Sequence, residues 1–275
     1  MGRLDGKVAF ITGAARGQGR SHAVRLAQEG CDIIAVDACH AFESVPYPGS
    51  TEADLKETVR LVEDCGRRII AAPADVRDLG AMQAIVDDGV AELGRLDIVL
   101  ANAGIASFGP TLTMSEDTWN EMIDINLTGV WKAVRAAAPK VVEGQRGGSI
   151  VLTSSSASIV AWENVAHYTA AKTGVVGLMR VLAKELAPHS IRVNSVHPTT
   201  VATDMVLNDS TYRLFRPELP NPTRADCEEI LMTMNALPIP AIEPIDVSNA
   251  ILYLVSDDAR YVTGSCHFIT AGAGL

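Results

Sequence analysis

Short apolar runs alternate with longer amphipathic segments along nearly the whole chain. Residues 7–12 (KVAFIT) form the first run, which is rich in β-branched side chains and ends at Gly13. Residues 17–30 follow with apolar side chains at helical spacing, and residues 32–36 form a second apolar run. Such runs are typical of buried strands, so these segments predict a strand, a helix and a second strand.

The same alternation continues to the end of the chain. Further helices are predicted over residues 52–65, 79–93, 116–140, 165–187 and 246–256. Further strands are predicted over residues 68–72, 97–101, 149–153, 191–196 and 266–270. Strands that are apolar on both faces must be covered on both faces, and right-handed crossovers place helices on each side. We therefore expect one α/β domain over residues 1–275, with a doubly wound, mainly parallel sheet of seven strands.

Two long stretches interrupt this rhythm. Residues 38–51 form a loop after the second predicted strand, and residues 199–244 contain six prolines together with Met, Leu and Phe side chains. Loops longer than about 12–15 residues are usually functional covers or disordered segments. The apolar content of residues 199–244 favours a substrate lid.

Composition narrows the classes of partner. The chain has 33 acidic and 23 basic residues, a formal net charge of −10, and phosphate backbones require clustered Lys and Arg. We expect no nucleic-acid partner. The start of the chain is charged and lacks the apolar run of a signal peptide. Residues 98–115, the longest uncharged stretch, contain glycines and a proline, so we expect no membrane span.

Cysteine and histidine spacing gives no metal signature. The five cysteines form no C-x-x-C pair, which disfavours a disulfide framework and a thiolate metal site. The six histidines are scattered without metal-ligand spacing, and we interpret them as surface or packing residues. We therefore expect no metal, and a reducing cytoplasmic location.

A glycine-rich turn, TGAARGQG over residues 12–19, lies between the first strand and the first helix. Its G-x-x-x-G-x-G spacing lets the backbone turn tightly and approach a pyrophosphate, whose charge the start of a helix favours. The residues expected to hold a dinucleotide here are Gly13, Ala15, Arg16, Gly17, Gln18 and Gly19.

Acidic and amide residues follow the next strands. Asp37 ends the second strand, where its carboxylate can accept hydrogen bonds from both adenosine ribose hydroxyls and would repel a 2′-phosphate. This position predicts NAD as the cofactor in preference to NADP. In a doubly wound sheet, ligands lie at the carboxyl ends of the strands. The same crevice should therefore include the residues after the third and fourth strands, which are Asp75, Val76, Asn102, Ala103 and Gly104.

Candidate reactive groups follow further along the chain. Tyr168 and Lys172 are four residues apart on a predicted helix and so share a face. An ammonium group or an oxidised nicotinamide favours the phenolate, which makes the pair a candidate acid/base. Ser155 ends a predicted strand, where its hydroxyl can bond a substrate oxygen. Asn126 lies in the preceding long helix, where a buried amide needs partners.

Taken together, these motifs resemble the short-chain dehydrogenase/reductase family. The matching positions, in order, are Thr12-Gly13-x-x-x-Gly17-x-Gly19, Asp75, Asn102-Ala103-Gly104, Asn126, Ser155 and Tyr168-x-x-x-Lys172. The resemblance implies a Rossmann fold and NAD-dependent oxidation of a secondary alcohol. It implies that Tyr168 is the proton donor or acceptor and that Ser155 holds the substrate oxygen. Lys172 would bind the nicotinamide ribose and lower the phenol's pKa, and Asn126 would support a water-linked proton path.

Two further features resemble a subgroup of carveol dehydrogenases and mycofactocin-associated oxidoreductases. These are residues 12–22 (TGAARGQGRSH) and Pro198-Thr199 in place of the family's usual Pro-Gly. In that subgroup the insertion at residues 38–51 is thought to cover NAD, so that the cofactor does not readily exchange and mycofactocin reoxidises it. The resemblance also implies that Pro198, Val201 and Thr203 hold the nicotinamide carboxamide, and that residues 116–140 and 165–187 pair across subunits of a homotetramer.

The substrate is predicted from the apolar side chains of residues 199–244 together with Trp162. They suit a cyclic or terpenoid, carveol-like alcohol, although the same side chains can instead pack between lid helices or between subunits. Two other functions stay open. One is a ketone or enone reductase that runs the reaction in reverse, and the other is a catalytically silent nucleotide-binding protein.

Overall fold

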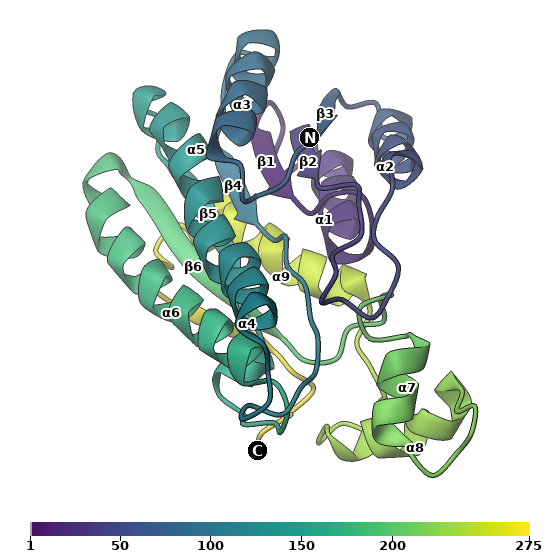
Figure 1. The fold of residues 1–275 in the computed structure, drawn as a ribbon. Coiled ribbons are helices and arrows are strands. Elements are labelled where there is room, and N and C mark those ends of the chain that lie inside the picture. Colours follow the sequence, from purple (N-terminus) through teal and green to yellow (C-terminus); the bar gives the residue numbers. More distant parts are fainter. Residues whose placement is uncertain (1) are drawn as a thin grey trace.

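A seven-stranded sheet forms the centre of the computed structural model, which describes residues 2–275 (Figure 1). In chain order the strands are β1 (Val8–Thr12), β2 (Asp32–Asp37), β3 (Ile69–Pro73), β4 (Ile98–Ala101), β5 (Gly148–Thr153), β6 (Ile191–Pro198) and β7 (Cys266–Ile269). Their spatial order is β3-β2-β1-β4-β5-β6-β7, and all six neighbouring pairs are parallel. The predicted fold class is confirmed, with a sheet that is parallel throughout.

Helices cover both faces of this sheet. In chain order they are α1 (Gly17–Gln28), α2 (Glu52–Asp64), α3 (Leu79–Leu93), α4 (Glu116–Ile123), α5 (Gly129–Glu143), α6 (Ala166–Leu186), α7 (Asp209–Phe215), α8 (Arg224–Thr233) and α9 (Pro244–Val255). Side chains of α3, α4, α5 and α6 share one hydrophobic core, whereas those of α1, α2 and α9 share the other. Within residues 2–275, no helix combines the length and the apolarity needed to cross a membrane.

The two cores explain why most strand positions are apolar. Along β1, Val8 and Phe10 point into the core beneath α3 to α6, whereas Ala9 and Ile11 point into the core beneath α1, α2 and α9. Alternate residues of a strand face opposite sides of a sheet, so a doubly covered strand is apolar at most positions. Buried polar residues of β6, among them Asn194, Ser195 and His197, instead have hydrogen-bond partners inside the protein. This requirement produced the apolar runs that identified the strands.

One predicted helix contains an irregular turn. Residues 116–140 are helical throughout, as predicted, but a π-helical turn at Asp124–Thr128 interrupts the α-helical pattern and separates α4 from α5. Asn126 lies in that turn, and its amide bonds the backbone of Ile105: Oδ1 accepts from the N–H at 3.1 Å and Nδ2 donates to the carbonyl at 3.1 Å. π-Helical turns are frequent at functional sites. The turn ties the helix to the loop that follows β4.

Residues 199–244 contain two short helices, α7 and α8, which stand apart from the sheet in Figure 1. Their segment is tied back to the C-terminal tail, because the Leu237 N–H donates to the Ala271 carbonyl at 2.9 Å. The helices contact one another and line a cavity next to the end of β5. This arrangement puts the proline-rich segment beside the strand ends where the candidate site residues lie.

Candidate functional site

The glycine-rich turn after β1 packs directly against the loop after β4. Gly13 has a φ of +69°, and a Cβ there would lie 2.8 Å from the Cα of Ala103. Thr12 joins the two loops through its Oγ1, which accepts from the N–H groups of Asn102 at 3.1 Å and Ala103 at 3.0 Å. The Asn102 side chain completes the contact by donating to the Thr12 carbonyl at 3.1 Å. A side chain at position 13 would push these loops apart.

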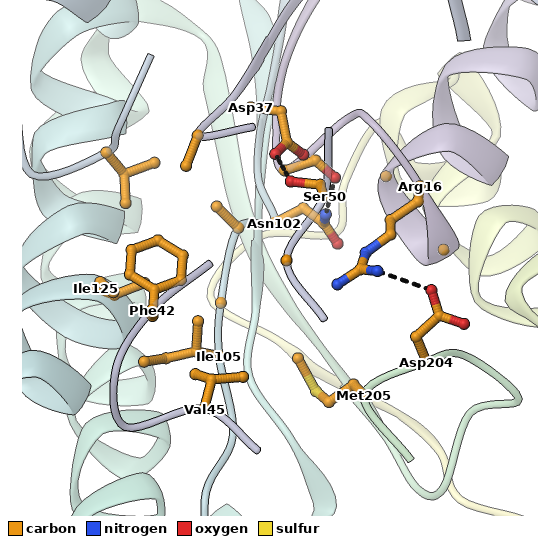
Figure 2. Close-up of a pocket in the computed structure, with 18 of the residues that line it drawn as sticks. Arg16, Asp37, Phe42, Val45, Ser50, Asn102, Ile105, Ile125, Asp204 and Met205 are labelled. Carbon is orange, nitrogen blue, oxygen red and sulfur yellow. Dashed lines mark hydrogen bonds and ion pairs between the residues drawn. The ribbon is translucent and has the colours of Figure 1, made fainter. Parts of the chain in front are cut away.

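Asp37 is buried at the end of β2 and orders the turn beside it (Figure 2). Its carboxylate accepts from the N–H groups of Ala15 at 2.9 Å and Cys39 at 3.1 Å, and from the Ser50 hydroxyl. A carboxylate offers about four acceptor positions. The three donors therefore leave one position for a ligand hydroxyl, and exchange of the Ser50 hydroxyl would free a second.

The predicted cofactor residues gather around one cavity. Its lining includes Gly13, Arg16, Gly17, Gln18, Gly19, Asp37, Asp75, Val76, Asn102, Ala103, Gly104 and Thr203. Ala15 lies behind this wall, where its N–H is bonded to Asp37. The Asp75 carboxylate is paired with Arg77 at 2.7 Å, so it faces the cavity already neutralised.

A second cavity, of about 440 Å³, adjoins the first. Seven of the predicted site residues line this cavity, namely Asn126, Ser155, Tyr168, Lys172, Pro198, Val201 and Thr203. Its apolar wall includes Phe108, Trp162, Val165, Met205, Val206, Leu214, Phe215, Leu231 and Met234. Gln18, Asn102, Gly104, Thr203 and Met205 line both cavities, so the two form one continuous site.

Tyr168 and Lys172 lie on α6 next to Ser155. Lys172 is buried, its Nζ donates to the Thr153 carbonyl at 3.0 Å, and that Nζ lies 5.7 Å from the centre of the Tyr168 ring. Burial lowers the pKa of Lys172 to about 8. Burial also raises the pKa of Tyr168, although the Ser155 hydroxyl opposes that rise. The expectation of a lowered phenol pKa is therefore not met by the protein alone, because desolvation outweighs an ammonium held at this distance.

The residues of the site fit a dinucleotide. Gln18 has a buried Oε1 with no hydrogen-bond partner, and its side chain lines both cavities. At Gly104 a Cβ would lie 2.6 Å from Asn126 Oδ1 and 3.2 Å from Lys172 Nζ, so only glycine keeps this passage open. The acidic Asp37 lies at one end of the combined site and the phenol of Tyr168 at the other. In residues 2–275, no cluster of three or more His, Cys, Asp or Glu is arranged to hold a metal ion.

Contacts between the two long stretches and the glycine-rich turn were not predicted from the sequence. Arg16 pairs with Asp204 at 2.9 Å and donates to the Pro48 carbonyl, so it joins residues 38–51 to residues 199–244 (Figure 2). The Tyr47 hydroxyl accepts from the Ala106 N–H at 3.2 Å, and burial raises the pKa of Tyr47 to about 12. The length of the insertion and the subgroup resemblance pointed to a cover, but not to these contacts, since isolated Tyr and Asp residues in loops form no pattern.

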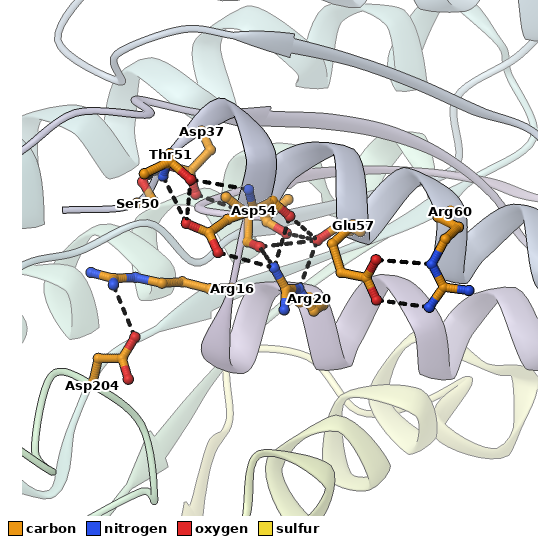
Figure 3. Close-up of polar contacts among 12 residues, drawn as sticks. Arg16, Arg20, Asp37, Ser50, Thr51, Asp54, Glu57, Arg60 and Asp204 are labelled. Carbon is orange, nitrogen blue, oxygen red and sulfur yellow. Dashed lines mark hydrogen bonds and ion pairs between the residues drawn. The ribbon is translucent and has the colours of Figure 1, made fainter. Parts of the chain in front are cut away.

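The insertion is also anchored where it enters α2 (Figure 3). Thr51 and Asp54 form a reciprocal cap, in which the Thr51 hydroxyl accepts from the Asp54 N–H and the Asp54 carboxylate accepts from the Thr51 N–H. Arg20 of α1 donates to the Asp54 carbonyl at 2.8 Å and to the Thr58 hydroxyl at 3.0 Å. The end of the insertion is therefore fixed against α1, the helix that the glycine-rich turn begins.

Several known proteins are similar to this chain over nearly its whole length. The family model for short chain dehydrogenases matches residues 7–213. The (−)-trans-carveol dehydrogenase of Rhodococcus erythropolis is 56% identical, with 100% of each chain covered. A crystal structure of carveol dehydrogenase from Mycobacterium avium in complex with NAD matches with a TM-score of 0.98 at 56% identity, over 99% of each chain. A short chain dehydrogenase from Mycobacterium paratuberculosis bound to NAD matches with a TM-score of 0.90 at 46% identity, over 98% of each chain.

Proposed function

Because the chain belongs to the short-chain dehydrogenase family, we propose that it is an oxidoreductase that transfers a hydride between a secondary alcohol and NAD. One observation carries the proposal: a single continuous site has Asp37 at one end and the group of Ser155, Tyr168 and Lys172 at the other. The acidic Asp37 favours the ribose hydroxyls of NAD over the 2′-phosphate of NADP. The relatives bound to NAD support the same cofactor.

Each polar residue of the reactive end has a separate role in this proposal. NAD, when bound, supplies the hydride acceptor. The Ser155 hydroxyl holds the alcohol oxygen, and Tyr168 takes up the hydroxyl proton as the carbinol hydrogen leaves as hydride. Lys172 holds the nicotinamide ribose and keeps a positive charge near the phenol below about pH 8, the pKa set by its burial. Asn126, fixed by the backbone of Ile105, supports a water path that carries the proton onward.

We propose an apolar cyclic or terpenoid alcohol as the substrate. The second cavity supports this, because large apolar side chains such as Trp162, Leu214 and Phe215 line it together with the polar pair Ser155 and Tyr168. The (−)-trans-carveol dehydrogenase of Rhodococcus erythropolis, which covers the whole chain, points to the same class. Residues 199–244 act as the lid of this cavity in the proposal, and α7 and α8 supply much of its apolar wall.

Residues 38–51 are proposed to cover the cofactor and slow its exchange. The supporting contacts are those of Arg16 with Asp204 and Pro48, and that of Tyr47 with Ala106, all of which bridge the cofactor cavity. A retained cofactor must be reoxidised in place. We therefore propose a separate redox carrier, mycofactocin in the related subgroup, as a partner that accepts the electrons.

We also propose that the protein is a homotetramer and that it works in a reducing cytoplasm. A homotetramer is supported by exposed aromatic side chains on α4 and α5, among them Trp119 and Trp131, which suit contacts between long helices. A reducing cytoplasm is supported by the cysteines, all of which are free thiols. Light scattering at micromolar concentration tests the assembly, and a monomer would contradict it.

The direct test is an alcohol panel followed at 340 nm, with NAD added and with an artificial electron acceptor in a parallel series. We expect turnover of apolar cyclic secondary alcohols in preference to polyols. Mass spectrometry of protein purified without added nucleotide should show whether NAD is retained. The reverse ranking of substrates would reject the apolar alcohol class. Silence in both series, with nucleotide still bound, would favour a catalytically silent nucleotide-binding protein.

A further inference from the structure

A cluster of one histidine and two serines, His197, Ser158 and Ser195, lies behind Ser155. His197 of β6 has no exposed surface. Its Nδ1 lies 2.9 Å from Ser158 Oγ and 3.3 Å from the Ser155 carbonyl oxygen, and its Nε2 lies 2.8 Å from Ser195 Oγ. The ring of Phe268 packs against the imidazole with 4.7 Å between ring centres. Every polar atom of the imidazole therefore has a partner inside the protein.

The direction of these hydrogen bonds can be assigned. The Ser158 hydroxyl donates to the Ser155 carbonyl at 2.7 Å, so its oxygen is available to accept from Nδ1–H of His197. Burial lowers the pKa of His197 to about 4, which leaves a neutral ring with a single N–H. With that proton on Nδ1, Nε2 accepts from the Ser195 hydroxyl. In this tautomer His197 donates through Nδ1 toward Ser158 and the Ser155 carbonyl, and it accepts through Nε2 from Ser195 of the same strand.

The consequence for Ser155 is a fixed peptide and a directed hydroxyl. The Ser155 carbonyl accepts a hydrogen bond from the Ser158 hydroxyl at 2.7 Å, and it lies 3.3 Å from Nδ1 of His197. Its own Oγ accepts from the Ala157 N–H at 3.1 Å, which occupies one lone pair. The rest of the hydroxyl is directed toward Tyr168 and the second cavity, which both residues line.

His197 also belongs to the other wall of the site. It directly precedes Pro198, and the residues that follow, Pro198 to Val201 and Thr203, line the same cavity as Ser155. His197 itself lines neither cavity, so it does not touch a ligand. It thus connects the end of β5, which bears Ser155, to the segment at the end of β6.

We propose that His197 is a positioning residue, which sets the Ser155 hydroxyl against the segment at the end of β6 by bonding Ser158 and the Ser155 carbonyl. This inference rests on the proposed function, in which Ser155 holds the substrate oxygen. A misplacement of about 1 Å near a reacting group can lower turnover about 100-fold. The cluster fixes Ser155 without adding a charge or a proton donor to the cavity.

Two substitutions at His197 separate its hydrogen bond from its bulk. His197→Leu fills similar space but removes the donor, whereas the amide of His197→Asn can place an N–H near the position of Nδ1. For His197→Leu we expect a kcat for alcohol oxidation lowered about 10- to 100-fold, with the Kd of NAD within about twofold of the parent. We expect His197→Asn to recover most of the turnover. Equal loss in both variants would show that the donor does not matter and would overturn the proposal.

A double-mutant cycle with Ser155→Ala tests whether His197 acts through Ser155. We expect His197→Leu to cause little further loss once the Ser155 hydroxyl is absent. A full additional loss would mean that His197 acts elsewhere, which overturns the proposal but leaves the proposed function intact. If Ser155→Ala alone leaves kcat unchanged, the proposed role of Ser155 fails first. If His197→Leu does not fold, Ser158→Ala takes its place in the cycle, with the same expected and contrary outcomes.

Discussion

The two ends of the site are built in different ways. At the cofactor end, the walls are strand ends and the glycine-rich turn, which are locked to one another by buried contacts such as those of Thr12 and Asp37. At the substrate end, α7 and α8 stand apart from the sheet (Figure 1), and one link between residues 199–244 and the glycine-rich turn is the partly exposed pair of Arg16 and Asp204. The cofactor-binding residues are therefore fixed by the sheet, whereas substrate selectivity and access depend on segments with fewer core contacts.

Tyr168→Phe has the largest expected effect, because it removes the reactive group held beside the sheet by α6. The change removes one hydroxyl, and with it the group proposed to move the proton. General acid/base catalysis contributes about 10² to 10⁴ in rate, so kcat should fall by at least about 10². Steady-state turnover of the best alcohol measures the loss, and calorimetry should find NAD binding intact. Turnover near that of the parent would remove Tyr168 from its role.

The pH profile probes the same phenol without a substitution. Because burial raises the pKa of Tyr168 above its usual value, only a small fraction of the phenol is ionised at neutral pH, and only that fraction can accept a proton. The kcat for alcohol oxidation should therefore rise about tenfold per pH unit from about pH 6. Above about pH 8 the rise should become shallower, because Lys172 then loses its charge. A flat profile from pH 6 to 8, with chemistry rate-limiting, would contradict this assignment.

Asp37→Asn tests the cofactor preference at the cofactor end of the site. Hydrogen bonds to a charged group contribute about 1.5–3 kcal/mol, so NAD affinity should fall about 10- to 100-fold. The preference over NADP should narrow, since the repelling charge is gone. Calorimetry with both nucleotides measures the two effects. Asp64→Asn on α2 changes the net charge equally outside the cavity, and it should leave both affinities unchanged.

Asp204→Asn addresses the link between residues 199–244 and the glycine-rich turn and should have the smallest effect. It breaks the pair with Arg16, and exposed ion pairs contribute about 0.2–1 kcal/mol. We expect bound NAD to dissociate about two- to fivefold faster in a chase experiment, with kcat little changed. Asp209→Asn, an exposed residue at the start of α7, is the matched control. Equal release rates for the parent and Asp204→Asn would mean that this pair does not restrain the cover.

The sequence was most informative where short-range rules apply. The apolar runs predicted every strand to within a few residues, because each strand serves two cores. The positions of Asp37 and Asn102 followed from the rule that parallel strands end at one edge. Tyr168 and Lys172 share a side of α6 because four residues make about one helical turn.

Other features depend on geometry that no local pattern encodes. The contact between Tyr47 and Ala106 joins positions 59 residues apart, and nothing in the spacing of either residue announces it. The direction of the Tyr168 pKa shift depends on how deeply the ring is buried and how far Lys172 lies from it. The π-helical turn around Asn126 was missed because apolar periodicity over so few residues does not distinguish it from an α-helix.

That π-helical turn fixes the number of residues between α4 and α5. It accommodates one more residue than an α-helical turn, and each residue of an α-helix advances by about 100°. Deleting a single residue between Asp124 and Thr128 would merge α4 and α5 into one regular helix and rotate the face of α5 away from α3, against which it packs. Insertions and deletions should therefore be excluded from this stretch even where substitutions are accepted, and any attempt to shorten the protein should begin elsewhere.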